Sequence, residues 1–298
     1  METASWMDST LVQLSASTLR LSAPLLLAAM GGLLSERAGV INIALEGLML
    51  MGAFAGAVAA VQFSSPAMGF LAALLAGGAL AALYGLFAIR WQANQIVAGT
   101  AINFLSAGLT PFFCKILYDV SGSTPTLPIE LRLTTEPIWA AWFLLLLLTW
   151  IWKKTPAGLW LRFAGEHPAA LDAAGISVRR TRWFAVILSG VLAGVAGATL
   201  SICLSSSFTR SMTAGRGFMA LAAVIFGKWK PIPTAIACLL FGFLDAAQMR
   251  LQGLQLGGVG VPVQFIQILP YIATVIVLAG FVGKSRAPRA LGLPSDSV

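Results

Sequence analysis

Long apolar runs are the feature that most restricts how this chain can fold. One of them, PAMGFLAALLAGGALAALYGLFAI at residues 66–89, has no charged side chain. It is longer than the roughly 18–20 residues that an α-helix needs to cross a bilayer. Charged residues make up only 10% of the chain, against roughly 25% in soluble domains. The sequence therefore predicts an all-α, polytopic membrane bundle.

The apolar runs predict about 8–10 transmembrane helices. Two runs are short, and the second of these begins with Gly215 and Gly217. We expect it to be a half-helix shielded by protein, because lipid cannot satisfy irregular backbone. The predicted spans are 10–34, 40–62, 66–89, 96–118, 137–152, 183–204, 214–227, 231–249 and 263–282.

The basic residues predict an orientation for a single transmembrane domain over residues 1–298. The net charge is +8, which we attribute to Lys and Arg retained on the cytoplasmic side rather than to a nucleic-acid partner. We expect the N-terminus outside and the C-terminus inside. The predicted parts are first-half helices 10–118, an outer loop 119–136, a cytoplasmic loop 153–182, second-half helices 183–282 and a cytoplasmic tail 283–298.

The two halves of the sequence share a weak internal similarity. LSAPLLLAAMGGLLS at 21–35 is similar to LSGVLAGVAGATLS at 188–201. In the predicted topology these segments cross the membrane in opposite directions, as in the inverted repeats that many transporters use. Helices rich in Ala, Gly and Leu also resemble one another by chance, so the repeat is an open hypothesis.

Polar side chains inside the apolar runs are the candidate translocation-path residues. Asn42 and Glu46 are spaced i, i+4, which would place them on one helix face. Glu46 could stay ionised beside a buried cation, be protonated, accept backbone N–H bonds from an interrupted helix, or contact a solute. The amides could bind a neutral solute or join helices. The candidates are Asn42, Glu46, Asn94, Gln95 and Asn103.

Three further acids and bases allow two interpretations each. Glu36 and Arg37 could form a solvated pair in a turn, or contact the cytoplasmic loop. Asp245 could pair with Arg250 for structural reasons or serve the path. We expect no catalytic residue, metal or cofactor, because the three cysteines are far apart and His167 is the sole histidine.

The cytoplasmic stretch GEHPAALDAAGI predicts a short helix. Pro168 suits the first helical position and Gly175 the residue after the last. About two turns are unstable alone in water, so this helix must pack against its own chain or a partner. The residues concerned are Gly165, Glu166, His167, Pro168, Ala169, Ala170, Leu171, Ala174, Gly175 and Ile176.

This stretch resembles the coupling segment of ATP-binding-cassette (ABC) permeases for branched-chain amino acids, ribose and nucleosides, which often reads G-x-N-P-x-A-A-x-x-A-G-I. Here His167 replaces the usual Asn. SERAGVINIALEGLML, from Ser35 to Leu50, is similar to the shorter nucleoside-type (simple-sugar) subunit, and GRGFMALAAVIFGKWKP also fits. The resemblance extends over about residues 20–280.

The resemblance implies a permease subunit of an importer for a nucleoside or related ribose-containing solute. It further implies a bacterial inner-membrane location, a second permease, a separate ATPase subunit and an extracytoplasmic solute-binding protein. In the family, the ATPase receives the coupling helix. A simple sugar, a riboflavin-like compound or a branched-chain amino acid remains open as the solute. Without the resemblance, a proton-coupled secondary transporter using Glu46 or Asp245 is an equal alternative.

Overall fold

The computed structural model describes residues 2–133, 136–251, 255–256, 259–260, 268, 272 and 286–294. Most of these residues are helical, and the two named strands form a hairpin of two residues each. The elements are α1 (Glu2–Arg37), α2 (Leu45–Gln62), α3 (Pro66–Gly85), a π-helical turn (Leu86–Arg90), α4 (Gln95–Tyr118), a 3₁₀ turn (Ile129–Leu131), α5 (Glu136–Lys154), α6 (Pro156–Glu166), α7 (Pro168–Ala173), α8 (Val178–Ala198), a second π-helical turn (Thr199–Leu204), α9 (Arg216–Phe226), α10 (Pro231–Leu251), β1 (Gln255–Leu256) and β2 (Val259–Gly260).

Within the described residues, six helices are long and apolar enough to cross a membrane, or seven if the bent pair α5–α6 forms one span. The all-α membrane bundle is thus confirmed. Each of the first eight predicted spans coincides with a helix, including the half-length α9. Of the ninth, 263–282, only residues 268 and 272 are described, so the total of 8–10 stays a prediction.

The start of the second span differs from the prediction. We expected a helix from residue 40, but α2 begins at Leu45 and residues 38–44 are not helical. Gly39 has a φ of +95°, a conformation that favours glycine because it has no Cβ. The chain therefore leaves α1 through an irregular segment, buried or half-buried throughout, before it enters α2.

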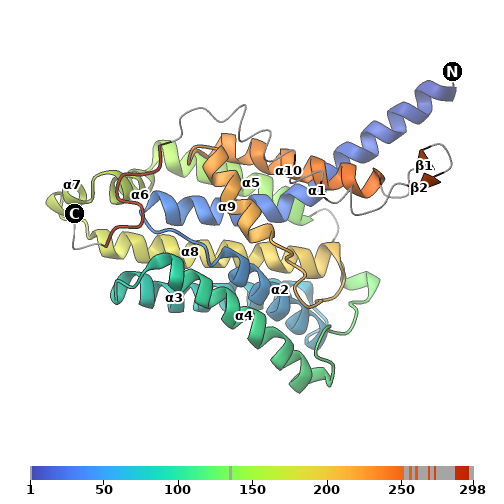
Figure 1. The fold of residues 1–298 in the computed structure, drawn as a ribbon, viewed down its shortest axis with the longest axis horizontal. Helices are drawn as coiled ribbons and strands as arrows, with labels where there is room; N and C mark the ends of the chain where they lie inside the picture. The colour runs from blue at the N-terminus through green and yellow to red at the C-terminus, as the bar shows by residue number, and fades with distance from the viewer. Residues whose placement is uncertain are drawn as a thin grey trace.

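Helices α1 and α8 form the antiparallel centre of the bundle. Arg182 Nε, near the start of α8, lies 3.1 Å from Ala38 O just beyond α1. At the other end Arg20 Nη2 lies 3.0 Å from Cys203 O. Figure 1 shows α3 and α4 on one side of this pair and α5 and α10 on the other, with α9 crossing between them. The opposed directions agree with the predicted topology, whereas the internal repeat stays a hypothesis.

Glycines bring α2, α3 and α8 into close contact. A Cβ added to Gly52 would lie 2.3 Å from Gly194 Cα, and one added to Gly77 would lie 2.3 Å from Gly190 O. In a membrane there is no hydrophobic driving force between helices, so their association depends on close packing. Small residues at the crossings let the helix backbones approach and gain dispersion energy. Helix α4 lies outside this contact, with 22% of its span buried against 78% for α8.

One end of the bundle gathers segments that are far apart in the sequence. The ends of α1 and α6, the start of α8, the short helix α7 and residues 286–294 lie together there (Figure 1). The N-terminus and the β1–β2 hairpin lie at the opposite end (Figure 1). We call the first the coupling end, after the segment predicted from the sequence.

Candidate functional site

The irregular segment 38–44 has its backbone polar groups bonded to side chains from other elements. The Ile41 N–H donates to Gln95 Oε1 at 2.8 Å, and the Tyr84 hydroxyl donates to Ile41 O. Asn103 donates to Ile43 O at 3.0 Å and accepts from the Gly47 N–H at 2.8 Å. Because unpaired backbone groups are costly in a membrane, Gln95 and Asn103 are structural anchors for this segment.

Asn42 and Asn94 occupy different settings. Asn42 is fully buried in the irregular segment, and its Nδ2 donates to Ser189 Oγ of α8 at 2.8 Å. It therefore does not share a face of α2 with Glu46, and that prediction is wrong because the helix begins three residues later. Asn94 is exposed and caps α4 by accepting the Ile96 and Val97 N–H groups.

Glu46 lies in the first turn of α2 and binds the start of α9. Its Oε1 accepts from the Thr213 hydroxyl at 2.6 Å and the Gly215 N–H at 2.9 Å. Its Oε2 accepts from the Gly217 N–H at 2.7 Å. The first N–H groups of a helix have no partner within it and attract negative charge. Of the alternatives for Glu46, the structure has the one in which it caps an interrupted helix.

Glu36 is buried, contrary to the expectation of a solvated pair. Its Oε2 accepts from Trp229 Nε1 at 2.6 Å, and only 3% of the residue is exposed. Its neighbour Arg37 pairs with Glu166 at 3.2 Å and lies over the Trp152 ring, so for Arg37 the other alternative, a contact with the cytoplasmic loop, is the one found. The correction arises because α1 continues through Arg37, so its last turn packs inside the bundle.

Asp245 does not have the partner that its spacing suggested. Arg250 Nη2 donates to Gln13 Oε1 at 2.7 Å. The cation whose charge acts on Asp245 is Arg216, at the start of α9. The spacing argument considered α10 alone, whereas Arg216 belongs to α9.

The predicted short helix exists as α7, between His167 and Gly175. Pro168 is its first residue, and Gly175 follows its end with a φ of +78°. The Ile176 N–H donates to Leu171 O at 3.2 Å, which closes the helix in a Schellman arrangement. Leu171 is buried and anchors α7, while Ala169, Ala170, Ala173 and Ala174 are exposed. Its outer face therefore consists mostly of small side chains, together with the exposed Asp172.

Arg182 connects the end of α6 and the C-terminal segment 286–294 to the irregular segment. It is 2% exposed, and besides Ala38 O its guanidinium donates to Leu293 O at 2.8 Å and Ala164 O at 3.4 Å. Gly165 approaches α1 so closely that an added Cβ would lie 2.2 Å from Arg37 O. Arg182 was not among the residues predicted from the sequence, because nothing in its local pattern distinguishes it from Arg179 or Arg180.

The chain matches the protein family described as the branched-chain amino acid transport system permease component over residues 14–278. The chain belongs to this family. The permease is 37% identical to the guanosine ABC transporter permease NupQ of Bacillus subtilis (strain 168), over 93% of this chain and 94% of the relative. It is 36% identical to the nucleoside ABC transporter permease NupC of Lactococcus lactis subsp. cremoris (strain MG1363), over 96% and 97%.

A putative glucose permease, and second permeases from the same two organisms, are also among its relatives. The putative glucose ABC transporter permease TsgC13 of Haloferax volcanii is 34% identical over 94% of each chain. A second permease from each of the first two organisms also matches, NupP at 23% and NupB at 21% identity. The family resemblance inferred from the sequence is thereby confirmed, and the permease is a multi-pass membrane protein.

Proposed function

We propose that this permease is a subunit of an ABC importer for a nucleoside or related ribose-containing solute. The observation that carries the proposal is the similarity to guanosine and nucleoside permeases along almost the whole of both chains. In this assembly, ATP hydrolysis belongs to a separate subunit, so the permease itself is not an enzyme. A glucose permease among the relatives supports a simple sugar as the alternative solute.

The second subunit of the pair would be a paralogous permease. NupP with NupQ, and NupB with NupC, are two different permeases from one organism, and all four match this chain. A two-permease pore would then be completed by ATPase subunits and an extracytoplasmic solute-binding protein. In the proposed orientation the coupling end and the C-terminus are cytoplasmic, in the bacterial inner membrane.

Helix α7 would be the ATPase-coupling helix. Its exposed alanines could enter a cleft, since they have no bulk, while Leu171 holds the helix to the permease. Asp172 Oδ1 accepts the Val178 N–H at 3.1 Å, which joins α7 to the start of α8. A displacement of α7 would thus be passed to α8, and through Arg182 to the irregular segment.

The translocation path would run beside the irregular segment. Asn42, Glu46, Gln95 and Asn103 would shape its wall by fixing the backbone. Asn94 borders an open pocket of about 330 Å³. Since Glu46 accepts three hydrogen bonds, two of them from the backbone, its geometry favours a fixed carboxylate over a proton-transfer site.

The solute is tested by uptake. Cells that lack the permease should lose accumulation of labelled guanosine or another nucleoside, and the intact gene should restore it. Unlabelled nucleosides should compete, whereas glucose and leucine should not. Competition by glucose alone would replace the nucleoside with the sugar alternative.

The coupling role is tested by Ala170→Glu, which adds a charge to the exposed face of α7 without disturbing Leu171. We expect nucleoside uptake to fall at least about tenfold, the equivalent of 1.4 kcal/mol of lost docking, while the permease still reaches the membrane. Ala67→Glu is the matched control, because Ala67 is also exposed on a helix, at the opposite end of the bundle. Equal uptake by both variants would exclude α7 as the docking helix.

A further inference from the structure

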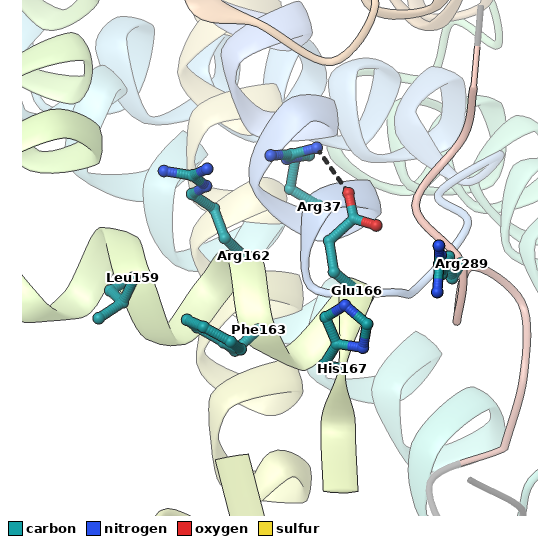
Figure 2. A pocket seen from close by; sticks show the side chains of 7 residues that line it. All are labelled: Arg37, Leu159, Arg162, Phe163, Glu166, His167 and Arg289. Carbon is teal, nitrogen blue, oxygen red and sulfur yellow. Dashed lines mark hydrogen bonds and ion pairs between the residues drawn. The ribbon is translucent and has the colours of Figure 1, made fainter. Parts of the chain in front are cut away.

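Two adjoining pockets at the coupling end form a basic groove that extends from Arg289 past α6 to the start of α10. The first, of about 410 Å³, is lined by Arg37, Arg162, Glu166 and Arg289 among others (Figure 2). The second, of about 370 Å³, contains Lys153 and Lys230. Both pockets include Arg37 and Arg162, so we treat them together as the basic groove.

The basic groove has a large excess of positive charge. Five cationic side chains and one carboxylate, that of Glu166, leave four positive charges if His167 is neutral. Glu166 is already paired with Arg37 (Figure 2). Among the residues that the structure describes, no carboxylate forms an ion pair with Lys153, Arg162 or Lys230. Cations gathered without counter-charges repel one another, so an anion in the groove would relieve that repulsion.

The floor of the groove is apolar and continues along α10. Trp152, Pro231 and Ile232 line the second pocket. Ile232 is 49% exposed, and Ile236, one turn farther along α10, is 61% exposed. Tryptophan side chains are typical of the boundary between headgroups and acyl chains. Exposed tryptophans at this end of the bundle include Trp91, Trp150 and Trp160.

We propose that the basic groove binds an anionic glycerophospholipid. Its phosphate would contact Lys153, Arg162 and Lys230, and its acyl chains would lie along Ile232 and Ile236. Basic pockets between transmembrane helices on the cytoplasmic side suit such headgroups. An acidic protein segment would use the charges but would have no need of the apolar strip, and therefore a lipid fits the groove better.

The bound lipid would hold the bend between α5 and α6 against the start of α10. These two helices meet at 77°, and α6 leads directly into α7 through His167. The lipid would therefore position the proposed coupling helix. This inference goes beyond the proposed function and does not depend on the identity of the solute, since lipid binding is measured without transport.

The test uses the full-length chain, purified in mild detergent with the subunits that accompany it. Native mass spectrometry should find retained phosphatidylglycerol or cardiolipin. The thermal midpoint should rise with added short-chain phosphatidylglycerol and not with phosphatidylcholine of equal chain length. For Lys153→Gln with Lys230→Gln, we expect binding roughly 10- to 30-fold weaker, because each basic residue near a headgroup contributes to affinity.

The matched control is Arg90→Gln with Lys154→Gln, which removes the same charge from exposed positions outside the groove. It should retain the lipid. An equal loss in both variants, or no preference of the wild type for phosphatidylglycerol, overturns the proposal. So does an equal thermal shift with soluble glycerol 3-phosphate, which would indicate an anion site. Loss of the ATPase subunit with lipid retained would assign the groove to a protein contact.

Discussion

Glu46 and Glu36 hold opposite ends of the same short helix, and they do so differently. Glu46 accepts two backbone N–H groups and a hydroxyl at the start of α9. Glu36 accepts the indole N–H of Trp229, three residues beyond the end of α9. The first turn of a helix offers unpaired N–H donors and a positive dipole end, whereas the last turn offers only carbonyls. A carboxylate can therefore cap the first end directly but needs a side-chain donor at the second.

Among variants that test the difference between the two ends of α9, we expect the largest loss of stability for Glu46→Ala. It leaves two backbone N–H groups and the Thr213 hydroxyl without their acceptor. Hydrogen bonds to a charged group contribute about 1.5–3 kcal/mol each, so we expect a loss of several kcal/mol and little folded protein. Thermal unfolding in detergent measures it.

Glu46→Gln separates hydrogen bonding from charge at the same site. The amide retains one acceptor oxygen, but its NH₂ group would face an N–H or hydroxyl donor. We expect the stability of this variant to lie between that of the wild type and that of Glu46→Ala. Stability and nucleoside uptake equal to the wild type would mean that neither the charge nor the second oxygen is needed.

The next largest effect is expected for Gly217→Ala, which tests how closely α9 approaches α2. The added Cβ would lie 2.5 Å from both Glu46 Cα and Glu46 N. Because backbone atoms cannot rotate aside, the helices must separate, at a cost of about 1–3 kcal/mol. The control is Gly108→Ala in α4, where nothing lies within 4 Å. It should be neutral or stabilising, by up to about 1 kcal/mol, so equal destabilisation of both would refute the close contact.

The smallest effect is expected for Glu36→Gln. The amide oxygen can still accept from Trp229 Nε1, and a neutral side chain is easier to bury than a carboxylate. We expect a change within about 1 kcal/mol in the same unfolding assay. A loss as large as that of Glu46→Ala would contradict the proposed difference between the two ends of α9.

Helix positions could be predicted from the sequence because they depend on local patterns. Eight spans appear as runs of apolar residues, and α7 appears through Pro168 and Gly175. The irregular segment 38–44 could not be found in this way, since VINIALEG reads as a continuous apolar helix. Its helix is interrupted because Gln95, Asn103 and Tyr84, from α3 and α4, provide the backbone with other hydrogen-bond partners.

The candidate polar residues could be found from the sequence because polar groups stand out in apolar runs. The roles of these residues could not be predicted in this way. Arg182 and Trp229 were missed, since each reads as an ordinary residue at the end of a span. By itself, the sequence determined the membrane class, most of the helices, the family and the short helix at the coupling end. Only the tertiary structure decided which donor each buried acid meets, because those donors lie more than a hundred residues away in the chain.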